Sequence, residues 1–105
     1  MTDARIVLTT TGSAEEARKL SRSIVERRLA ACVNIVPQIH SVYRWKGQVE
    51  EATEWLLIIK TQAAAFERLR DAIKELHSYE VPECVMLEIA AGSKPYLDWI
   101  NDNSL

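Results

Sequence analysis

The segment HSYEVPEC, residues 77–84, holds the groups in this sequence that are best suited to metal chemistry. It combines the imidazole of His77, the carboxylate of Glu83 and the thiol of Cys84. Imidazole suits divalent transition metals, and Cu²⁺ stands at the top of the divalent affinity order. His77 also falls at the end of a predicted helix, where unsatisfied carbonyl groups favour a cation. These three residues are therefore the predicted ligands of a weak, copper-preferring site, whose binding weakens as the pH falls toward the imidazole pKa of about 6.5.

The same segment also has a purely structural interpretation. His77 could simply end the helix and hydrogen-bond to its last turn. Cys84 could pack as a small hydrophobic residue, as free cysteines commonly do. Tyr79 and Glu83 could hydrogen-bond to each other or to loop backbone. The local sequence leaves the metal site and the helix terminus open as alternatives.

A second set of residues could line either a ligand crevice or a subunit interface. Its aromatic members carry large apolar surfaces, which on a long hairpin commonly fill an interface. Its one cation ends an apolar strand, and could reach into a crevice or extend to solvent. The set consists of Tyr43, Trp45, Lys60 and Tyr79.

No catalytic constellation is recognisable. The sequence lacks a glycine-rich phosphate loop, a nucleophile elbow and a paired-cysteine motif at zinc spacing. We therefore expect a protein that is not an enzyme and has no obligatory cofactor, with copper or another divalent cation as its possible ligand.

The elements that must position these residues follow from hydrophobic periodicity and from the places of glycine and proline. Read along the chain, they are strand 5–12, helix 13–29, strand 30–45, strand 48–61, helix 63–76, strand 81–91 and a short helix at 93–100. This βαββαβ order predicts an α+β, ferredoxin-like split βαβ sandwich with a long hairpin and a C-terminal helix. Right-handed crossovers place both long helices on one face, with strand order four, one, three, two. We expect one domain over residues 1–105.

Local signals support this assignment. Ser13, with Glu16 three residues later, has the spacing of a capping box at a helix start. Pro37 should stop or bend the second strand, because it lacks a ladder donor. Lys46–Gly47 should form the tight hairpin turn, and Ser93 should cap the last helix.

Composition excludes several classes of function. The net charge is −2 and the 13 basic residues are dispersed, which does not suggest nucleic-acid binding. The longest strictly apolar run, WLLII, is far shorter than a membrane span, and the start MTDAR is too acidic for a signal peptide. The two cysteines, Cys32 and Cys84, should lie on opposite edges of the sheet and stay unpaired, which fits a reducing compartment. A soluble, cytoplasmic protein is expected.

The hairpin points to self-assembly. The strand expected at 48–61, which forms its second arm, would be roughly 40 Å long at about 3.3 Å per residue. The tip of the hairpin should therefore extend beyond the body of the domain. A free ribbon carrying Tyr43, Trp45 and Trp55 would present unpaired edges that favour aggregation. Pairing with sister subunits would remove those edges.

Four segments in order, AACVNI, SVYRWKG, EATEWLLIIKT and HSYEVPE, resemble the CutA divalent-cation tolerance proteins over almost the whole chain. The resemblance implies a ferredoxin-like protomer, a compact homotrimer, a link to copper and other divalent cations, and no established reaction. Many members have proline where Ser78 stands. Three functions stay open: a metal-binding trimer, a PII-like trimer that binds a small anionic molecule between subunits and contacts a partner through its hairpin, and an assembly scaffold without a ligand.

Overall fold

The protein is built on a four-stranded antiparallel sheet with the strand order β2-β3-β1-β4. A computed structural model describes residues 2–105. The strands are β1 (Ala4–Thr11), β2 (Cys32–Trp45), β3 (Gln48–Gln62) and β4 (Val85–Glu88). This order and the alternation with helices confirm the predicted ferredoxin-like α+β fold.

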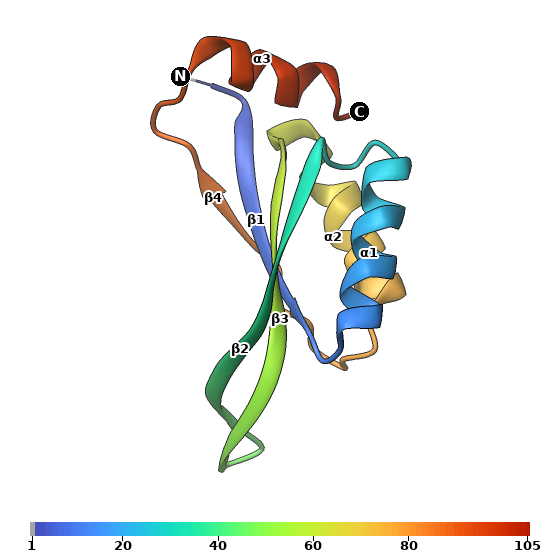
Figure 1. The fold of residues 1–105 in the computed structure, drawn as a ribbon, viewed down its shortest axis with the longest axis vertical. Helices are drawn as coiled ribbons and strands as arrows, with labels where there is room; N and C mark the ends of the chain where they lie inside the picture. The colour runs from blue at the N-terminus through green and yellow to red at the C-terminus, as the bar shows by residue number, and fades with distance from the viewer. Residues whose placement is uncertain (1) are drawn as a thin grey trace.

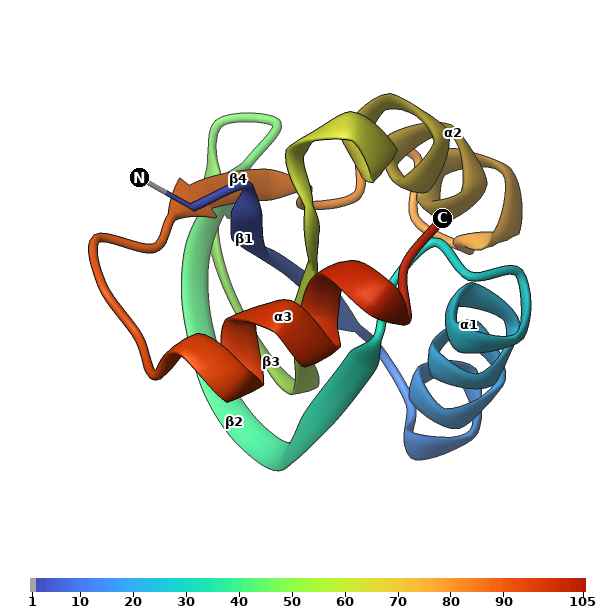
Figure 2. The same cartoon turned by 90° about the horizontal axis from the view of Figure 1, so that it is seen from above.

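Two helices cover the same face of the sheet, as the right-handed crossovers require. They are α1 (Ala14–Glu26) and α2 (Phe66–Leu76), the latter preceded by a single 3₁₀ turn at Ala63–Ala65. The C-terminal helix α3 (Lys94–Asp102) crosses one end of the sheet, while the β2–β3 hairpin projects from the other end (Figures 1 and 2). None of the helices in residues 2–105 is both long and apolar enough to cross a membrane.

The hydrophobic core lies between the sheet and the two long helices. Val7, Leu57 and Ile59 point from the sheet toward this layer and are fully buried. The helices contribute apolar residues at three- and four-residue spacing, which places them on one side of each helix. They are Ala17, Leu20 and Ile24 from α1, and Leu69, Ala72 and Ile73 from α2.

The opposite face of the sheet also carries apolar side chains. Its residues can be assigned because side chains alternate along each strand and cross-strand partners share a face. α3 contacts β1 and β3 at one end. The ribbon views show neither long helix on this side (Figures 1 and 2). We call this surface the open face; its apolar residues are Ile6 and Leu8 from β1, Leu56 and Ile58 from β3, Val36 from β2, and Val85 and Leu87 from β4.

Most of the predicted local signals are confirmed. The Ser13 hydroxyl accepts a hydrogen bond from the Glu16 N–H at 3.1 Å. The register of β2 against β3 shifts between Val36 and Ile39, at the expected proline bend. Both turn residues have positive φ, 49° at Lys46 and 81° at Gly47, the conformation of a two-residue hairpin turn that matches strand twist.

The C-terminal part confirms one expectation and corrects another. Ser93 occupies the predicted N-cap position of α3, although its side chain makes no capping hydrogen bond. The strand predicted at 81–91 is only Val85–Glu88. Pro82 supplies no ladder donor, and β4 has a partner on one side only, pairing with four residues of β1. The two cysteines are unpaired, as expected.

The hairpin turn provides a test of backbone conformation. No atom lies within 4 Å of a Cβ added at Gly47, so a side chain there meets no obstacle. The Gly47→Val variant should nevertheless lose about 1–2 kcal/mol of unfolding free energy, because an L-residue with a Cβ is strained at positive φ. Guanidinium denaturation at fixed protein concentration measures the loss.

Lys46→Asn is the matched control, since asparagine tolerates the left-handed region. Its stability should equal or slightly exceed that of the wild type. A Gly47→Val protein as stable as the wild type would contradict the turn geometry.

Candidate functional site

His77 is the C-cap residue of α2, and its side chain is completely buried. Its Nε2 lies 2.6 Å from the carbonyl oxygen of Thr10, so Nε2 carries the proton and donates it. Its Nδ1 accepts the backbone N–H of Tyr79 at 3.0 Å. Both ring nitrogens are therefore used, which leaves no lone pair for a metal unless a hydrogen bond breaks.

Glu16 ties the same turn to the first helix. Its carboxylate accepts the Ser78 backbone N–H at 2.8 Å and the Ser78 hydroxyl at 3.0 Å. It also lies 3.8 Å from Nδ1 of His77. Burial alone would raise the pKa of Glu16, but the hydrogen bonds from the backbone and hydroxyl of Ser78 and from the Gly12 backbone outweigh it and lower this pKa. The turn at residues 77–79 is thus fixed to both β1 and α1.

Tyr79 links the turn at residues 77–79 to strand β3 of the hairpin. Its hydroxyl donates to the Glu54 carboxylate at 2.8 Å, and Glu54 is only 8% exposed. The pKa of Tyr79 is raised by burial, by the hydrogen bond to Glu54 and by the negative charge of that carboxylate. The phenol therefore stays protonated and acts as a hydrogen-bond donor.

A cavity of about 730 Å³ lies between the β2–β3 hairpin and residues 78–83. We call it the hairpin crevice. Its charged groups are all carboxylates, from Glu54, Glu80 and Glu83, and its lining includes no lysine, arginine or histidine. The remaining walls are Thr10, Ile39, Ser41, Val42, Tyr43, Trp45, Leu56, Ser78, Tyr79 and Val81.

The three predicted metal ligands have different surroundings. Glu83 lines the hairpin crevice. Cys84 packs against the core, and burial raises the pKa of its thiol, opposed by Arg70 and reinforced by Glu83. A raised pKa disfavours the thiolate that binds metals. Within residues 2–105, no three His, Cys, Asp or Glu side chains are grouped closely enough to hold a metal ion.

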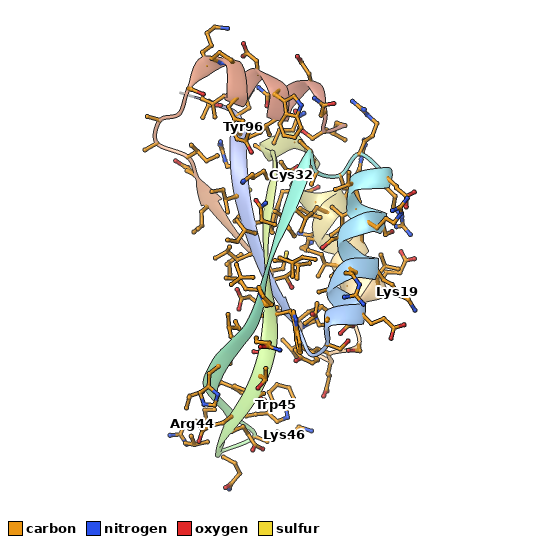
Figure 3. The ribbon with its side chains drawn as sticks, viewed as in Figure 1. Lys19, Cys32, Arg44, Trp45, Lys46 and Tyr96 are labelled. Atoms are coloured by element: carbon orange, nitrogen blue, oxygen red, sulfur yellow. The ribbon has the colours of Figure 1, made fainter. Side chains whose placement is uncertain are left out.

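The predicted crevice residues separate into two places. Tyr43, Trp45 and Tyr79 line the hairpin crevice, but Lys60 does not. Lys60 instead contacts Asn34 on β2 and the ring of Tyr96 on α3. Figure 3 shows Trp45 near the hairpin tip and Tyr96 at the far end of the molecule.

Comparison with known proteins decides the family. Residues 5–103 match the family described as "CutA1 divalent ion tolerance protein". The chain belongs to the CutA1 family. It is 52% identical over 99 residues to the divalent-cation tolerance protein CutA of Thermus thermophilus, a match that covers 94% of this chain and 96% of that relative.

Solved structures agree with this membership. The Thermus thermophilus protein superimposes with a TM-score of 0.94 at 50% identity, covering 96% of this chain and 98% of the other. A structure from Nostoc sp. PCC 7120, titled a PII-like protein CutA in apo form, gives a TM-score of 0.90 at 37% identity, covering 96% and 97%. The ferredoxin-like fold and the CutA resemblance are both confirmed.

The expected cytoplasmic location is wrong as an inference from this sequence. A relative from Arabidopsis thaliana, 46% identical over 94% of this chain and 54% of its own length, is named chloroplastic. A solved relative from Archaeoglobus fulgidus, with a TM-score of 0.92 at 40% identity over 95% of this chain and 97% of its own, is titled periplasmic. Low charge, few cysteines and short apolar runs therefore do not fix the compartment in the CutA1 family.

The chain spans almost all of the Thermus relative but a smaller part of others. It covers 57% of the Xenopus laevis relative and 47% of the Homo sapiens one. The activities and partners of those longer proteins are therefore not transferred to this chain.

Sequence reasoning missed two groups in this site. Glu54 lies two and four residues before Leu56 and Ile58 on β3, so its position on the same face could have been found from the two-residue period of the strand. Glu16 was expected only as a cap partner of Ser13. No local pattern indicates its bonds to Ser78, because the two residues are 62 positions apart.

The Tyr79–Glu54 bond predicts a pH-dependent stability. Tyr79→Phe leaves a buried carboxylate without its donor and should reduce the free energy of unfolding by about 1–3 kcal/mol at neutral pH. The folded pKa of Tyr79 is raised, so its contribution is fully present below the unfolded pKa of about 10 and is lost as the pH rises above it. The difference between wild type and variant should therefore shrink above about pH 10.

Tyr43→Phe is the control for this measurement, since Tyr43 lines the same crevice and is 43% exposed. The free energy of unfolding of Tyr43→Phe, measured by denaturation, should equal that of the wild type across the pH range. A constant difference between wild type and Tyr79→Phe from pH 7 to about pH 11 would contradict the assignment.

The Glu16 bonds predict the opposite pH dependence. The folded pKa of Glu16 is lowered, so its stabilisation is present above the unfolded pKa of about 4.3 and is lost as the pH falls through the folded value. Glu16→Gln should destabilise by about 1–3 kcal/mol at pH 7 and should show a smaller further loss in acid than the wild type. Urea denaturation at neutral and acid pH tests this.

Glu15→Gln is the matched control, because Glu15 forms only an exposed pair with Lys19. Such pairs contribute little. Equal destabilisation by the two variants at pH 7 would show that the Ser78 bonds have no special importance.

Proposed function

We propose that this protein is a homotrimer that acts in divalent-cation tolerance and binds divalent cations weakly in the hairpin crevice. The observation that carries the proposal is the charge of that crevice, whose ionisable lining consists of three carboxylates and two tyrosines. Membership of the CutA1 family, described as divalent ion tolerance proteins, supports the choice of ligand. The proposed role is binding, without a catalysed reaction.

The charge of the hairpin crevice favours a cation over an anion as its ligand. Glu54, Glu80 and Glu83 give the crevice a negative field, and its lining offers no basic side chain in compensation. Because the crevice walls are partly apolar, that field is less screened than on an open surface. A small anionic molecule of the kind proposed for a PII-like sensor is therefore disfavoured in this crevice.

The proposed binding is weak for a structural reason. Glu54 already accepts the Tyr79 hydroxyl, and no group of three metal-ligating side chains exists within residues 2–105. One subunit thus offers one or two carboxylates, and further ligands come from water or from a neighbouring subunit. For a given site Cu²⁺ binds more tightly than Zn²⁺, so copper is the preferred ion.

His77 has a positioning role in this proposal. Its bonds to Thr10 and Tyr79 hold the wall of the crevice that carries Glu80 and Glu83. The predicted ligand set of His77, Glu83 and Cys84 therefore reduces to Glu83, joined by Glu80. The two assignments differ in their pH dependence, because an imidazole ligand titrates near pH 6.5 and a carboxylate near 4.3.

The proposed trimer is supported by apolar surfaces and strand edges that are exposed in a single chain. The open face carries apolar residues on all four strands, and β2 and β4 are edge strands with unpaired backbone groups. The four residues of β4 are all exposed, including Leu87 at 47%. Burial of such a surface between like subunits is typical of obligate oligomers.

Calorimetric titration of the wild-type protein with Cu²⁺ and Zn²⁺ tests the cation site. Glu80→Gln and Glu83→Gln should each weaken Cu²⁺ binding by about tenfold, whereas Glu75→Gln on the exposed side of α2 should not. Binding should fall with a midpoint below about pH 5.5.

A midpoint near 6.5 together with loss in His77→Ala alone would favour histidine ligation and contradict the carboxylate site. Equal Cu²⁺ binding by wild type and both crevice variants would also overturn the proposal. The His77→Ala titration requires a thermal unfolding curve beside it, since this variant removes two internal hydrogen bonds.

Light scattering tests the assembly. The wild type should give a mass near three times 11.9 kDa at micromolar concentration. Leu87→Lys places a charge on the open face and should shift the mass toward the monomer. Val25→Lys, on the exposed surface of α1, is the control and should leave the mass unchanged. A monomeric wild type would refute the trimer.

A further inference from the structure

His77 is a buried titratable group to which the proposed function gives only a positioning role. Its side chain is completely buried. Its Nε2 lies 2.6 Å from the Thr10 carbonyl oxygen on β1, and its Nδ1 accepts the Tyr79 N–H at 3.0 Å. The same Nδ1 lies 3.8 Å from the Glu16 carboxylate on α1. Figure 1 shows the connection from β1 to α1 beside the segment after α2, so this ring lies where these elements meet.

Addition of one proton changes the role of Nδ1. In the neutral ring, its lone pair accepts the Tyr79 N–H. A proton taken from solvent turns that lone pair into an N–H bond and gives the ring one positive charge. Two N–H donors then face each other, so the hydrogen bond from Tyr79 breaks. The Nε2–H bond to the Thr10 carbonyl stays, because Nε2 is a donor in both forms.

Glu16 supplies the acceptor that the protonated ring needs. Although burial raises its pKa, the hydrogen bonds from Ser78 lower it overall, so the carboxylate is ionised at about pH 6.5, where a free imidazole titrates. A hydrogen bond from an imidazolium to a carboxylate is charge-assisted and strong. Both carboxylate oxygens already accept from Ser78, through its N–H and its hydroxyl. The protonated ring therefore competes with Ser78 for Glu16 and draws the turn into a second arrangement.

The other charged groups around this ring are farther away or point outward. Within residues 2–105, Glu16 is the one carboxylate within 4.0 Å of its nitrogens. Glu54 on β3 is reached through the hydroxyl of Tyr79, whose raised pKa keeps it neutral. On α2, Lys74 and Glu75 are exposed, and β1 contributes a backbone carbonyl. Glu16 is thus the group that distinguishes the protonated from the neutral state.

We propose that His77 is a pH-operated switch of the turn at residues 77–79, with its neutral ring holding the Tyr79 N–H and its protonated ring bound to Glu16. The chain that follows this turn carries Glu80 and Glu83 in the wall of the hairpin crevice. Release of the Tyr79 N–H therefore loosens that wall in acid. The consequence for cation binding rests on the proposed function, whereas the switch itself is tested on the metal-free protein.

Nuclear magnetic resonance of the isotope-labelled, metal-free protein provides the measurement, over a titration from about pH 8 to about pH 5. The ring resonances of His77 and the amide proton of Tyr79 should shift with one common midpoint. The amide proton should move upfield, because it loses its hydrogen bond. His40 is the other histidine of the chain and is exposed beside Glu51. The His40→Gln variant is therefore the matched control, and its Tyr79 amide should titrate as in the wild type.

Glu16→Gln tests the acceptor. It keeps the size of the side chain and removes the charge, so the common midpoint should fall by about one pH unit or more, because a nearby opposite charge favours the charged imidazole. His77→Gln is the second variant if Glu16→Gln fails to fold. It retains an N–H donor for the Thr10 carbonyl but has no titratable group, so its Tyr79 amide shift should not depend on pH over this range.

Three results would overturn the switch. They are a Tyr79 amide that stays unchanged while His77 titrates, an unchanged midpoint in folded Glu16→Gln, and a Tyr79 titration that persists in His77→Gln. Glu80→Gln and Glu83→Gln should leave the titration of the metal-free protein as in the wild type. Loss of the proposed cation site and failure of the switch are therefore distinguished by separate measurements.

Discussion

The one-sided placement of α1 and α2 is the constraint on which the rest of this structure depends. Right-handed crossovers from β1 to β2 and from β3 to β4 put both helices on the same face of the sheet. The core forms between them and that face, around Val7, Leu57 and Ile59. The other face keeps apolar side chains and two unpaired edges. A chain of this size thus gains its core and, by the same geometry, acquires a surface suited to self-association.

The turn at residues 77–79 joins this core to the hairpin crevice. Burying an imidazole is tolerated because both of its nitrogens are satisfied, by the Thr10 carbonyl and the Tyr79 N–H. Glu16 accepts two bonds from Ser78, and Tyr79 reaches Glu54. The wall of the crevice is consequently positioned by polar bonds to β1, α1 and β3, so displacement of the turn would disturb all three.

Opposite charges lie at opposite ends of the molecule. The hairpin crevice gathers carboxylates, whereas the Lys60 ammonium contacts Asn34 and the ring of Tyr96 at the other end. This separation explains why the net charge of −2 gives no guide to ligands. Local fields in partly desolvated sites depend on the nearest groups rather than on the total charge. Lys60, expected in the same set as Tyr79, lies apart from the hairpin crevice.

The sequence by itself determined the family, the order of elements and the turn chemistry. Ser13, Pro37 and Gly47 act through their own backbone and near neighbours, so their effects are readable locally. Tertiary structure alone decided the partners of His77, the burial of Glu54 and the separation of Lys60 from the crevice. Those contacts join residues 25 to 67 positions apart. A helix terminus has the same sequence pattern whether its histidine faces solvent, a metal or a carbonyl oxygen. Only the tertiary fold brings the end of β1 to this terminus, where the Thr10 carbonyl oxygen accepts a hydrogen bond from the imidazole.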